Sequence, residues 1–248
     1  MPSLTNPPPS PGPFPPTRLS VLEAVRSDDR AVRLQAFERL AGAYWKPVYK
    51  YLRLRWHVSA EDAEDLAQGF FAAAFEKAFF ERFDPARGRF RTFLRTCLDG
   101  FASKQRAAAR AQKRGGGAPH LHLDFAQAEG ELVRQPPGAE LDLDEYFHRE
   151  WMRGLFEQAV ESLRRRAAET GKGVPFAVFE RYDLQRGTKA VTYADVASEL
   201  GLPVTQVTNH LSAMRRELRR HLMEALRALC GSEEEFRQEA RLLLGREP

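Results

Sequence analysis

Apolar residues recur at steps of three and four along most of the chain, whereas alternating, strand-like patterns are scarce. This periodicity predicts amphipathic helices and an all-α fold. A first helical block extends from about residue 18 to residue 114, and a second begins near residue 145. Three glycines at 115–117, followed by Ala118-Pro119, end the first block. Glycine and proline both interrupt helices.

Two helices joined by a tight turn are predicted between residues 192 and 222. Thr192 can cap the first helix, with Asp195 completing a Thr-x-x-Asp variant of the capping box. Gly201 supplies the left-handed residue that often ends a helix, and Pro203 suits the first turn of the next helix. The second helix should face a core with regularly spaced apolar residues, which are Val207, Leu211, Met214, Leu218 and Leu222.

The opposite face of this second helix carries short polar groups and guanidiniums, namely Gln206, Thr208, Asn209, Ser212, Arg215, Arg216 and Arg219. Such groups bind base edges and phosphates, so the pattern predicts a helix-turn-helix that grips duplex DNA. An ordinary amphipathic hairpin with a solvated basic face is the alternative, because tight helical turns with glycine are common in all-α proteins. A second basic segment upstream and the basic balance of the chain favour DNA binding.

The pattern divides the chain into a proline-rich disordered tail at 1–17, a helical domain at 18–117, an acidic linker at 118–144, a second helical domain at 145–230 and a C-terminal helical extension at 231–248. The linker lacks clear periodicity and contains Pro136-Pro137, so we expect it to be extended or loosely ordered. Its acids are Asp124, Glu129, Glu131, Glu140, Asp142 and Asp144.

A helix predicted over residues 59–79 has an acidic beginning, where Ser59 and Asp62 resemble a capping box. Its side chains divide into an inward set of Leu66, Phe70, Ala74 and Phe75 and an outer set of Asp62, Asp65 and Gln68. Acids in a first turn stabilise any helix through its dipole, which would make them purely structural. Docking against a basic partner is the other explanation, and the residue chemistry favours neither.

A loop at residues 82–94 follows, because Asp84-Pro85 and Arg87-Gly88 are turn signals. It interleaves four arginines with three phenylalanines: Arg82, Arg87, Arg89 and Arg91 with Phe83, Phe90 and Phe93. This composition is typical of proteins that bind single-stranded nucleic acid, in which rings stack on bases and guanidiniums hold phosphates. Phenylalanines also fill cores, and for any single one of these rings we expect burial.

The helix predicted over residues 92–114 is basic on one face. Only Asp99 opposes its cations, which are Arg95, Lys104, Arg106, Arg110, Lys113 and Arg114. A face of nearly one sign repels itself and favours an anionic partner. We therefore expect DNA affinity that depends strongly on salt.

The composition narrows the function further. The 248 residues have room for two small domains and carry a formal net charge of +4 with an isoelectric point near 9.2. Cys97 and Cys230 lie far apart without metal-ligand spacing, which predicts two thiols and no metal. No apolar run reaches the ~20 residues that cross a bilayer, and the N-terminus lacks signal-peptide features, so we expect a cytoplasmic protein without membrane insertion. No residues form a catalytic constellation, so neither enzyme activity nor a cofactor is expected.

Three segments together resemble bacterial RNA polymerase sigma factors of the extracytoplasmic-function (ECF) group. DAEDLAQGFF resembles a helix of these factors, FDPARGRFRTFLRTCLDGFASKQRAAARAQKRGGG their promoter-melting loop and following helix, and VTYADVASELGLPVTQVTNHLSAMRREL their C-terminal helix-turn-helix. The resemblance covers roughly residues 35–115 and 146–228. It implies that the first helical domain is sigma domain 2 and the second is sigma domain 4.

The resemblance also implies roles for individual residues. Core RNA polymerase would dock on Asp62, Asp65 and Gln68. The loop from Asp84 to Thr92 would capture a base flipped from the −10 promoter element. The −10 DNA would be held by Arg87, Arg89, Arg91, Arg95, Lys104, Arg106 and Arg110. The −35 element would be bound by Gln206, Thr208, Asn209, Ser212, Arg215, Arg216 and Arg219.

Further expectations come from the same resemblance. The acidic linker would run toward the RNA exit path, and an anti-sigma protein or another regulator is a candidate additional partner. Gly69 stands where the family usually has an acid, which would weaken one polymerase contact, and Phe93 stands where many members have tryptophan. The competing hypotheses are a helix-turn-helix regulator that acts without polymerase, a sigma-like adaptor without promoter use, and an enzyme acting on nucleic acid. The last would need a metal-binding acid cluster, which the sequence does not provide.

Overall fold

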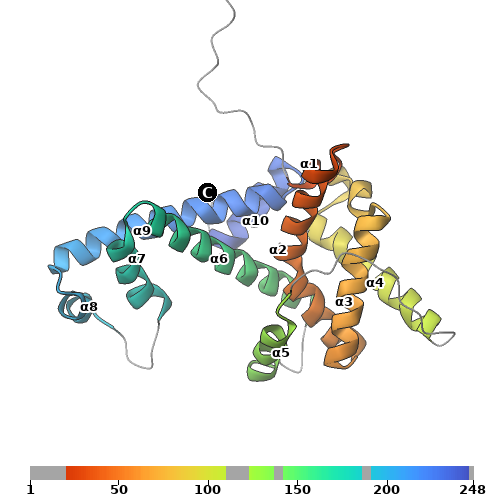
Figure 1. Ribbon diagram of the computed structural model, residues 1–248, viewed down its shortest axis with the longest axis horizontal. Coiled ribbons are helices and arrows are strands. Elements are labelled where there is room, and N and C mark those ends of the chain that lie inside the picture. The colour runs from red at the N-terminus through yellow and green to blue at the C-terminus, as the bar shows by residue number, and fades with distance from the viewer. Residues whose placement is uncertain (1–20, 110–122, 137–141, 186–190, 246–248) are drawn as a thin grey trace, which may run out of the picture.

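The described part of the protein, in a computed structural model, consists of residues 21–109, 123–136, 142–185 and 191–245. Within these ranges the chain forms helices and no strand, which confirms the all-α prediction (Figure 1). The proline-rich tail, the glycines at 115–117 and Arg110 lie outside the described residues.

The first helical block begins with a short helix, α1 (Val21–Ala24), and a long one, α2 (Arg30–Trp56). Ser59 accepts a hydrogen bond from the Asp62 amide and caps α3 (Ala60–Glu76), as predicted. Two 3₁₀ turns, η1 (Phe79–Arg82) and η2 (Pro85–Arg87), form the predicted loop. The basic helix α4 (Phe90–Ala109) follows directly.

The linker is not uniformly extended. Asp124 accepts a hydrogen bond from the Gln127 amide and caps a helix, α5 (Phe125–Arg134), that packs on α2. Phe125 and Ala128 of α5 are buried in the same apolar cluster as α2. The expectation of an extended or loosely ordered linker is therefore wrong over these residues. The helix cap at Asp124 and the burial of Phe125 stabilise a helix despite the acidic composition.

The second half contains α6 (Leu143–Glu169), α7 (Gly173–Phe179), a π-helical turn η3 (Glu180–Leu184), α8 (Tyr193–Leu200), α9 (Val204–Leu229) and α10 (Glu233–Leu244). Thr192 and Asp195 form the predicted capping box, and Gly201 adopts the predicted left-handed conformation with φ of 65°. Pro203 is the residue before α9 rather than part of its first turn.

Two apolar clusters form the core, and α6 and α9 each contribute to both. Phe147 and Trp151 of α6 join the first cluster, whereas Leu163 and Ala167 join the second, with α7 and α8. The C-terminal half of α9 and α10 also enter the first cluster, through Leu226, Phe236 and other residues. In Figure 1, α6 and α9 lie side by side along the long axis of the molecule. The two halves of the chain are thus joined by packed helices.

Cys97 and Cys230 are free thiols, as predicted. None of the helices in the described ranges combines the length and apolarity that a bilayer-spanning segment requires.

Candidate nucleic-acid interface

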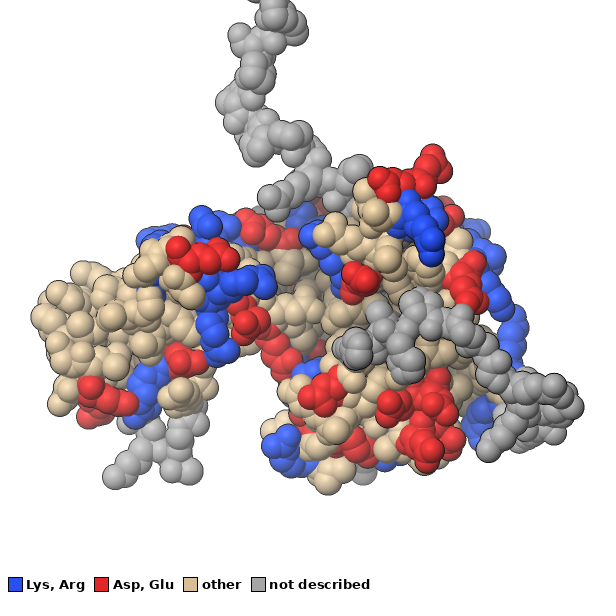
Figure 2. All heavy atoms as spheres, viewed as in Figure 1, with Lys and Arg blue, Asp and Glu red and all other residues tan. Residues whose placement is uncertain are grey.

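One candidate surface lies on the first half of α9. Gln206, Asn209, Ser212 and Arg216 are exposed on it, while Thr208 and Arg219 are half-buried. Figure 2 shows a largely uncharged surface at the end of the molecule formed by α8 and the beginning of α9. Amide and hydroxyl groups that face solvent from one helix are suited to base edges, and Arg216 adds a cation beside them.

Arg215 differs from its neighbour Arg216 because it is already paired. Its Nε and one terminal nitrogen each lie 2.8 Å from the Asp183 carboxylate, and the guanidinium stands over the Tyr182 ring at 5.7 Å. The hydrogen bond with Asp183 raises the pKa of Arg215. Arg215 therefore fastens the η3 turn to α9, whereas Arg216 has no ion-pair partner among the described residues.

The phenylalanines of the Arg/Phe loop belong to the core. Phe83 and Phe90 are buried and lie edge to face with ring centroids 5.2 Å apart. Phe93 is half-buried against both of them. The expectation of burial is confirmed for Phe83 and Phe90, which leaves the loop's arginines, rather than its rings, to meet a ligand.

Three arginines of the loop and of α4 are held by the C-terminal half of the chain. Arg91 donates to Glu239 of α10, and Arg95 donates to Asp144 of α6. Arg89 donates to the Gln238 side chain at 2.9 Å and also lies 3.5 Å from Glu239. The inner part of the predicted −10 surface is therefore covered by α10 and by the beginning of α6.

A second carboxylate of α10 reaches the beginning of the basic helix. Glu235 accepts a hydrogen bond of 2.9 Å from the Phe90 amide and one of 2.8 Å from the Gly231 amide. The Phe90 amide lies at the N-terminus of α4, where the first amides of a helix have no acceptor within the helix itself. A negative charge at this position is stabilised by the helix dipole. Burial nevertheless raises the pKa of Glu235 above its ordinary value.

Glu239 is fully buried, at 0% exposure, between α10, α4 and α6. Burial alone would raise the pKa of its carboxyl group, but the neighbouring His148 and Arg91 side chains lower it overall. Three buried polar atoms at this contact have no hydrogen-bond partner among the described residues: His148 Nε2, Trp151 Nε1 and Glu239 Oε2. His148 Nε2 lies 3.2 Å from Glu239 Oε2, within ion-pair range but without hydrogen-bond geometry.

The outer part of the basic surface is open. Arg87, Lys104 and Arg106 are exposed, and Arg106 stands over the Trp56 ring at 5.4 Å. Asp99, the single acid of this helix, accepts hydrogen bonds from Tyr51 and Trp56 of α2. Burial and the bond with Asp99 raise the pKa of Tyr51 to about 12. Asp99 therefore anchors α4 to α2 and does not neutralise its exposed cations.

The acidic beginning of α3 forms a separate surface. Asp62 and Asp65 are exposed, and neither forms an ion pair with another described residue. Gln68 is half-buried and donates to Glu64 at 3.4 Å. Figure 2 shows acidic side chains gathered where α3 begins. The inner face is as expected at Phe70 and Ala74, which are buried, while Leu66 and Phe75 are only half-buried.

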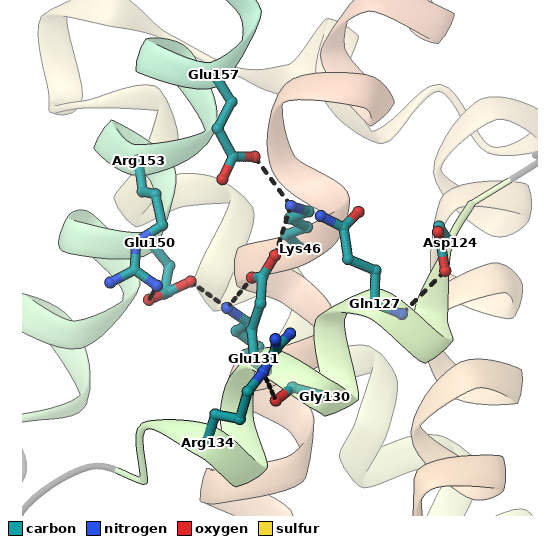
Figure 3. A network of polar contacts seen from close by, with 10 residues as sticks. Lys46, Asp124, Gln127, Gly130, Glu131, Arg134, Glu150, Arg153 and Glu157 are labelled. Atoms are coloured by element: carbon teal, nitrogen blue, oxygen red, sulfur yellow. Dashed lines mark hydrogen bonds and ion pairs between the residues drawn. The ribbon is translucent and has the colours of Figure 1, made fainter. Parts of the chain in front are cut away.

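The glutamates of α5 pair with cations of α2. Glu131 accepts from Lys50 at 2.7 Å and from Lys46 at 3.0 Å, and Lys50 also donates to the buried Glu150 at 2.5 Å (Figure 3). Glu129 accepts hydrogen bonds from the Arg53 guanidinium and from the Tyr49 hydroxyl. These carboxylates are occupied by α2 cations and do not form a free acidic strand toward an RNA path.

No pattern in the sequence predicted that Glu235 and Glu239 cover the loop, that Asp144 pairs with Arg95 or that His148 lies beside Glu239. No local signal identifies them, because Glu239 lies 148 residues from Arg91 in the chain. Within the described ranges, no three His, Cys, Asp or Glu side chains converge as ligands for a metal ion.

The region from α2 to α4 is the part of the chain with a recognised family relationship. A family model for Sigma-70 region 2 matches residues 40–113, which include most of α2, all of α3, the loop and α4. No curated protein and no solved structure matches the chain. Sigma-70 region 2 takes part in promoter recognition and melting and binds core RNA polymerase and promoter DNA. The match over residues 40–113 therefore supports a factor of the sigma-70 family.

Proposed function

We propose that this chain is a transcription initiation factor of the ECF group that recruits core RNA polymerase to particular promoters. The observation that carries the proposal is the Sigma-70 region 2 match at residues 40–113, together with the distribution of charge over those residues. An unpaired acidic face on α3 and an exposed basic face on α4 lie within the matched region. The role is regulatory and involves no catalysis by the chain itself.

In this proposal the acidic face of α3 docks on polymerase through Asp62, Asp65 and Gln68. Charged groups that are exposed and unpaired steer association without the cost of breaking an internal pair. Gly69, which follows this face, is close to the Phe101 ring, since a Cβ there would lie 3.4 Å from Phe101 Cζ. That distance is an ordinary van der Waals contact, so the packing of α3 on α4 at the edge of the docking face does not itself require glycine.

Promoter DNA would contact two separate surfaces. Helices α8 and α9 act as a helix-turn-helix that reads the −35 element through the exposed polar groups of α9. The −10 element is held by α4 and the loop before it, with Arg87, Lys104 and Arg106 available in the structure as it stands. Arg89, Arg91 and Arg95 can join them only after they leave Glu239, Gln238 and Asp144. Residues 18–117 then correspond to sigma domain 2, and residues 145–230 to sigma domain 4.

Co-purification with core RNA polymerase tests this proposal. The full chain and its Asp65→Arg variant would each be mixed with purified bacterial core polymerase and separated by size. We expect the unmodified chain to migrate with polymerase and the variant to remain free while it keeps its affinity for duplex DNA. If neither protein binds polymerase but both bind duplex DNA, the chain is a helix-turn-helix regulator. Polymerase binding without any defined transcript would indicate a sigma-like adaptor.

A further inference from the structure

We infer that α10 is an intramolecular plug that covers the inner part of the −10 surface, so that α10 and promoter DNA compete for Arg89 and Arg91. This inference rests on the proposed function, because it assigns promoter DNA as the competing ligand. The plug consists of Gly231 and the α10 residues Glu235, Gln238 and Glu239.

The plug imitates a bound polyanion in its chemistry. Glu239 supplies a carboxylate to Arg91 and lies within ion-pair range of Arg89, and Glu235 supplies another to the amide at the beginning of α4. Guanidiniums and free amides at a helix N-terminus are the groups that bind DNA phosphates. The same donors cannot serve the carboxylates and a phosphate backbone at once.

The plug also fits sterically over the loop. At Gly231 the backbone lies so close to the loop that a Cβ would be 2.6 Å from Phe83 Cε1 and 3.2 Å from Pro85 Cγ. Phe83 is buried by other rings of the first cluster and has little freedom to move aside. Any residue with a side chain at this position would therefore press the C-terminal segment away from the loop.

The contact of α10 with the loop and α4 has features that favour its release. The apolar contact of α10 consists of the buried Phe236 and Ala240 and the half-buried Leu243, so it is a small part of the core. Trp151 Nε1 is buried there without a hydrogen-bond partner among the described residues, and exposure to water would satisfy it. A small apolar contact and an unsatisfied polar atom both favour an opening that DNA or polymerase can drive.

The experiment compares the unmodified full chain with two variants that open the contact by different means. Glu235→Gln/Glu239→Gln removes the charges that hold the loop, and Gly231→Ala introduces a clash without changing any charge. Glu234→Gln is the matched control, because Glu234 is exposed on the same helix and, among the described residues, accepts a hydrogen bond from Gln238 alone. Circular dichroism establishes that each protein is folded, and Gly231→Ala carries the test if the double variant is not.

Two measurements are made on each protein. Amide hydrogen exchange over residues 84–95 reports whether the loop is covered, and the anisotropy of a fluorescein-labelled fork-junction DNA with a randomised single strand reports binding. We expect faster exchange and at least about a tenfold lower Kd in both opened variants, because apparent affinity scales with the population of the competent state. Glu234→Gln should behave as the unmodified chain.

The possible failures are distinguishable. Unchanged exchange in the opened variants, or faster exchange with the same Kd as the unmodified chain, overturns the plug and leaves the promoter function standing. Faster exchange with no DNA binding by any variant, even with core polymerase present, overturns the promoter function of this surface and the competition with it.

Discussion

Lys50 Nζ of α2 lies 2.5 Å from Glu150 Oε2 of α6, and the two side chains are only 1% and 5% exposed. A second carboxylate, that of Glu131 on α5, lies 2.7 Å from the same nitrogen. This buried cluster fastens the linker helix and the long helix α6 to the region that matches Sigma-70 region 2. It is one physical reason why the two halves of the described chain are packed together.

Removing one member of this cluster should cost considerable stability. We expect Glu150→Ala to lower the free energy of unfolding by about 3 kcal/mol, near the lower end for a broken buried pair, because Lys50 keeps Glu131. Urea denaturation followed by circular dichroism measures the change. Glu161→Ala on the same helix is the control, since its pair with Arg164 is exposed and should be worth less than about 1 kcal/mol. Equal losses in the two variants would contradict the assignment.

The α5 contact should make the protein sensitive to acid. A hydrogen bond from Arg53 lowers the pKa of Glu129, and bonds from Lys50 and Lys46 lower the pKa of Glu131 despite its burial. A carboxylate with a depressed folded-state pKa contributes stability that is complete above its unfolded pKa of about 4.3. That contribution is lost as the pH falls through the lower, folded-state pKa.

Melting temperatures measured from neutral pH down through this range test the expectation. Glu129→Gln should melt lower than the unmodified chain at neutral pH and should lose less further stability on acidification. Glu161→Gln, an exposed change on α6, should retain the full acid dependence. If Glu129→Gln lost as much stability in acid as the unmodified chain, the carboxylate would not be responsible.

Arg215 and Arg216 should behave differently although they are adjacent. Arg216→Ala should weaken binding to duplex DNA and reduce the salt dependence by about one released counterion, with no loss of stability. Arg215→Ala should also lower the melting temperature, because it removes the pair with Asp183. Asp183→Ala separates the two effects, since it breaks the pair and leaves Arg215 free for DNA. Fluorescence anisotropy over a salt series and thermal melting provide the readings; identical effects of both arginine variants on melting would contradict the structure.

Polymerase docking should depend on the beginning of α3 and not on its end. Asp65→Arg reverses an exposed, unpaired charge and should reduce polymerase affinity by more than tenfold, since like charges at an interface cost several kcal/mol. Glu76→Arg reverses an exposed acid at the other end of the same helix and should leave affinity within about twofold. Biolayer interferometry against immobilised core polymerase measures both. Equal loss in the two variants would indicate a general charge effect.

Local signals predicted much of the fold. The caps at Ser59 and Thr192 and the left-handed Gly201 each depend on a few neighbouring residues, and each was predicted from the sequence. Helix α5 was missed because its acids suggested a solvated linker, whereas the structure uses them to neutralise Lys46, Lys50 and Arg53 of α2. A carboxylate has the same appearance in a sequence whether it faces water or a buried lysine.

The candidate site was predictable only in part, for a similar reason. Residue type and spacing identified the basic loop and the basic helix as ligand-binding surfaces. The occupation of Arg91 by Glu239 and of Arg95 by Asp144 depends on tertiary packing between distant segments, which leaves no periodic trace. Exposed Arg87 and internally paired Arg91 are therefore indistinguishable in the sequence.

Transcription in a purified system tests the central claim most directly. Core RNA polymerase, a library of genomic promoter fragments and the full chain would be incubated with nucleotides, and the 5′ ends of the transcripts would be mapped. We expect discrete start sites that require the chain, share two separated upstream sequence elements and disappear with Asp65→Arg. An absence of chain-dependent transcripts, both for the unmodified chain and for the opened Gly231→Ala variant, would contradict the assignment as an initiation factor.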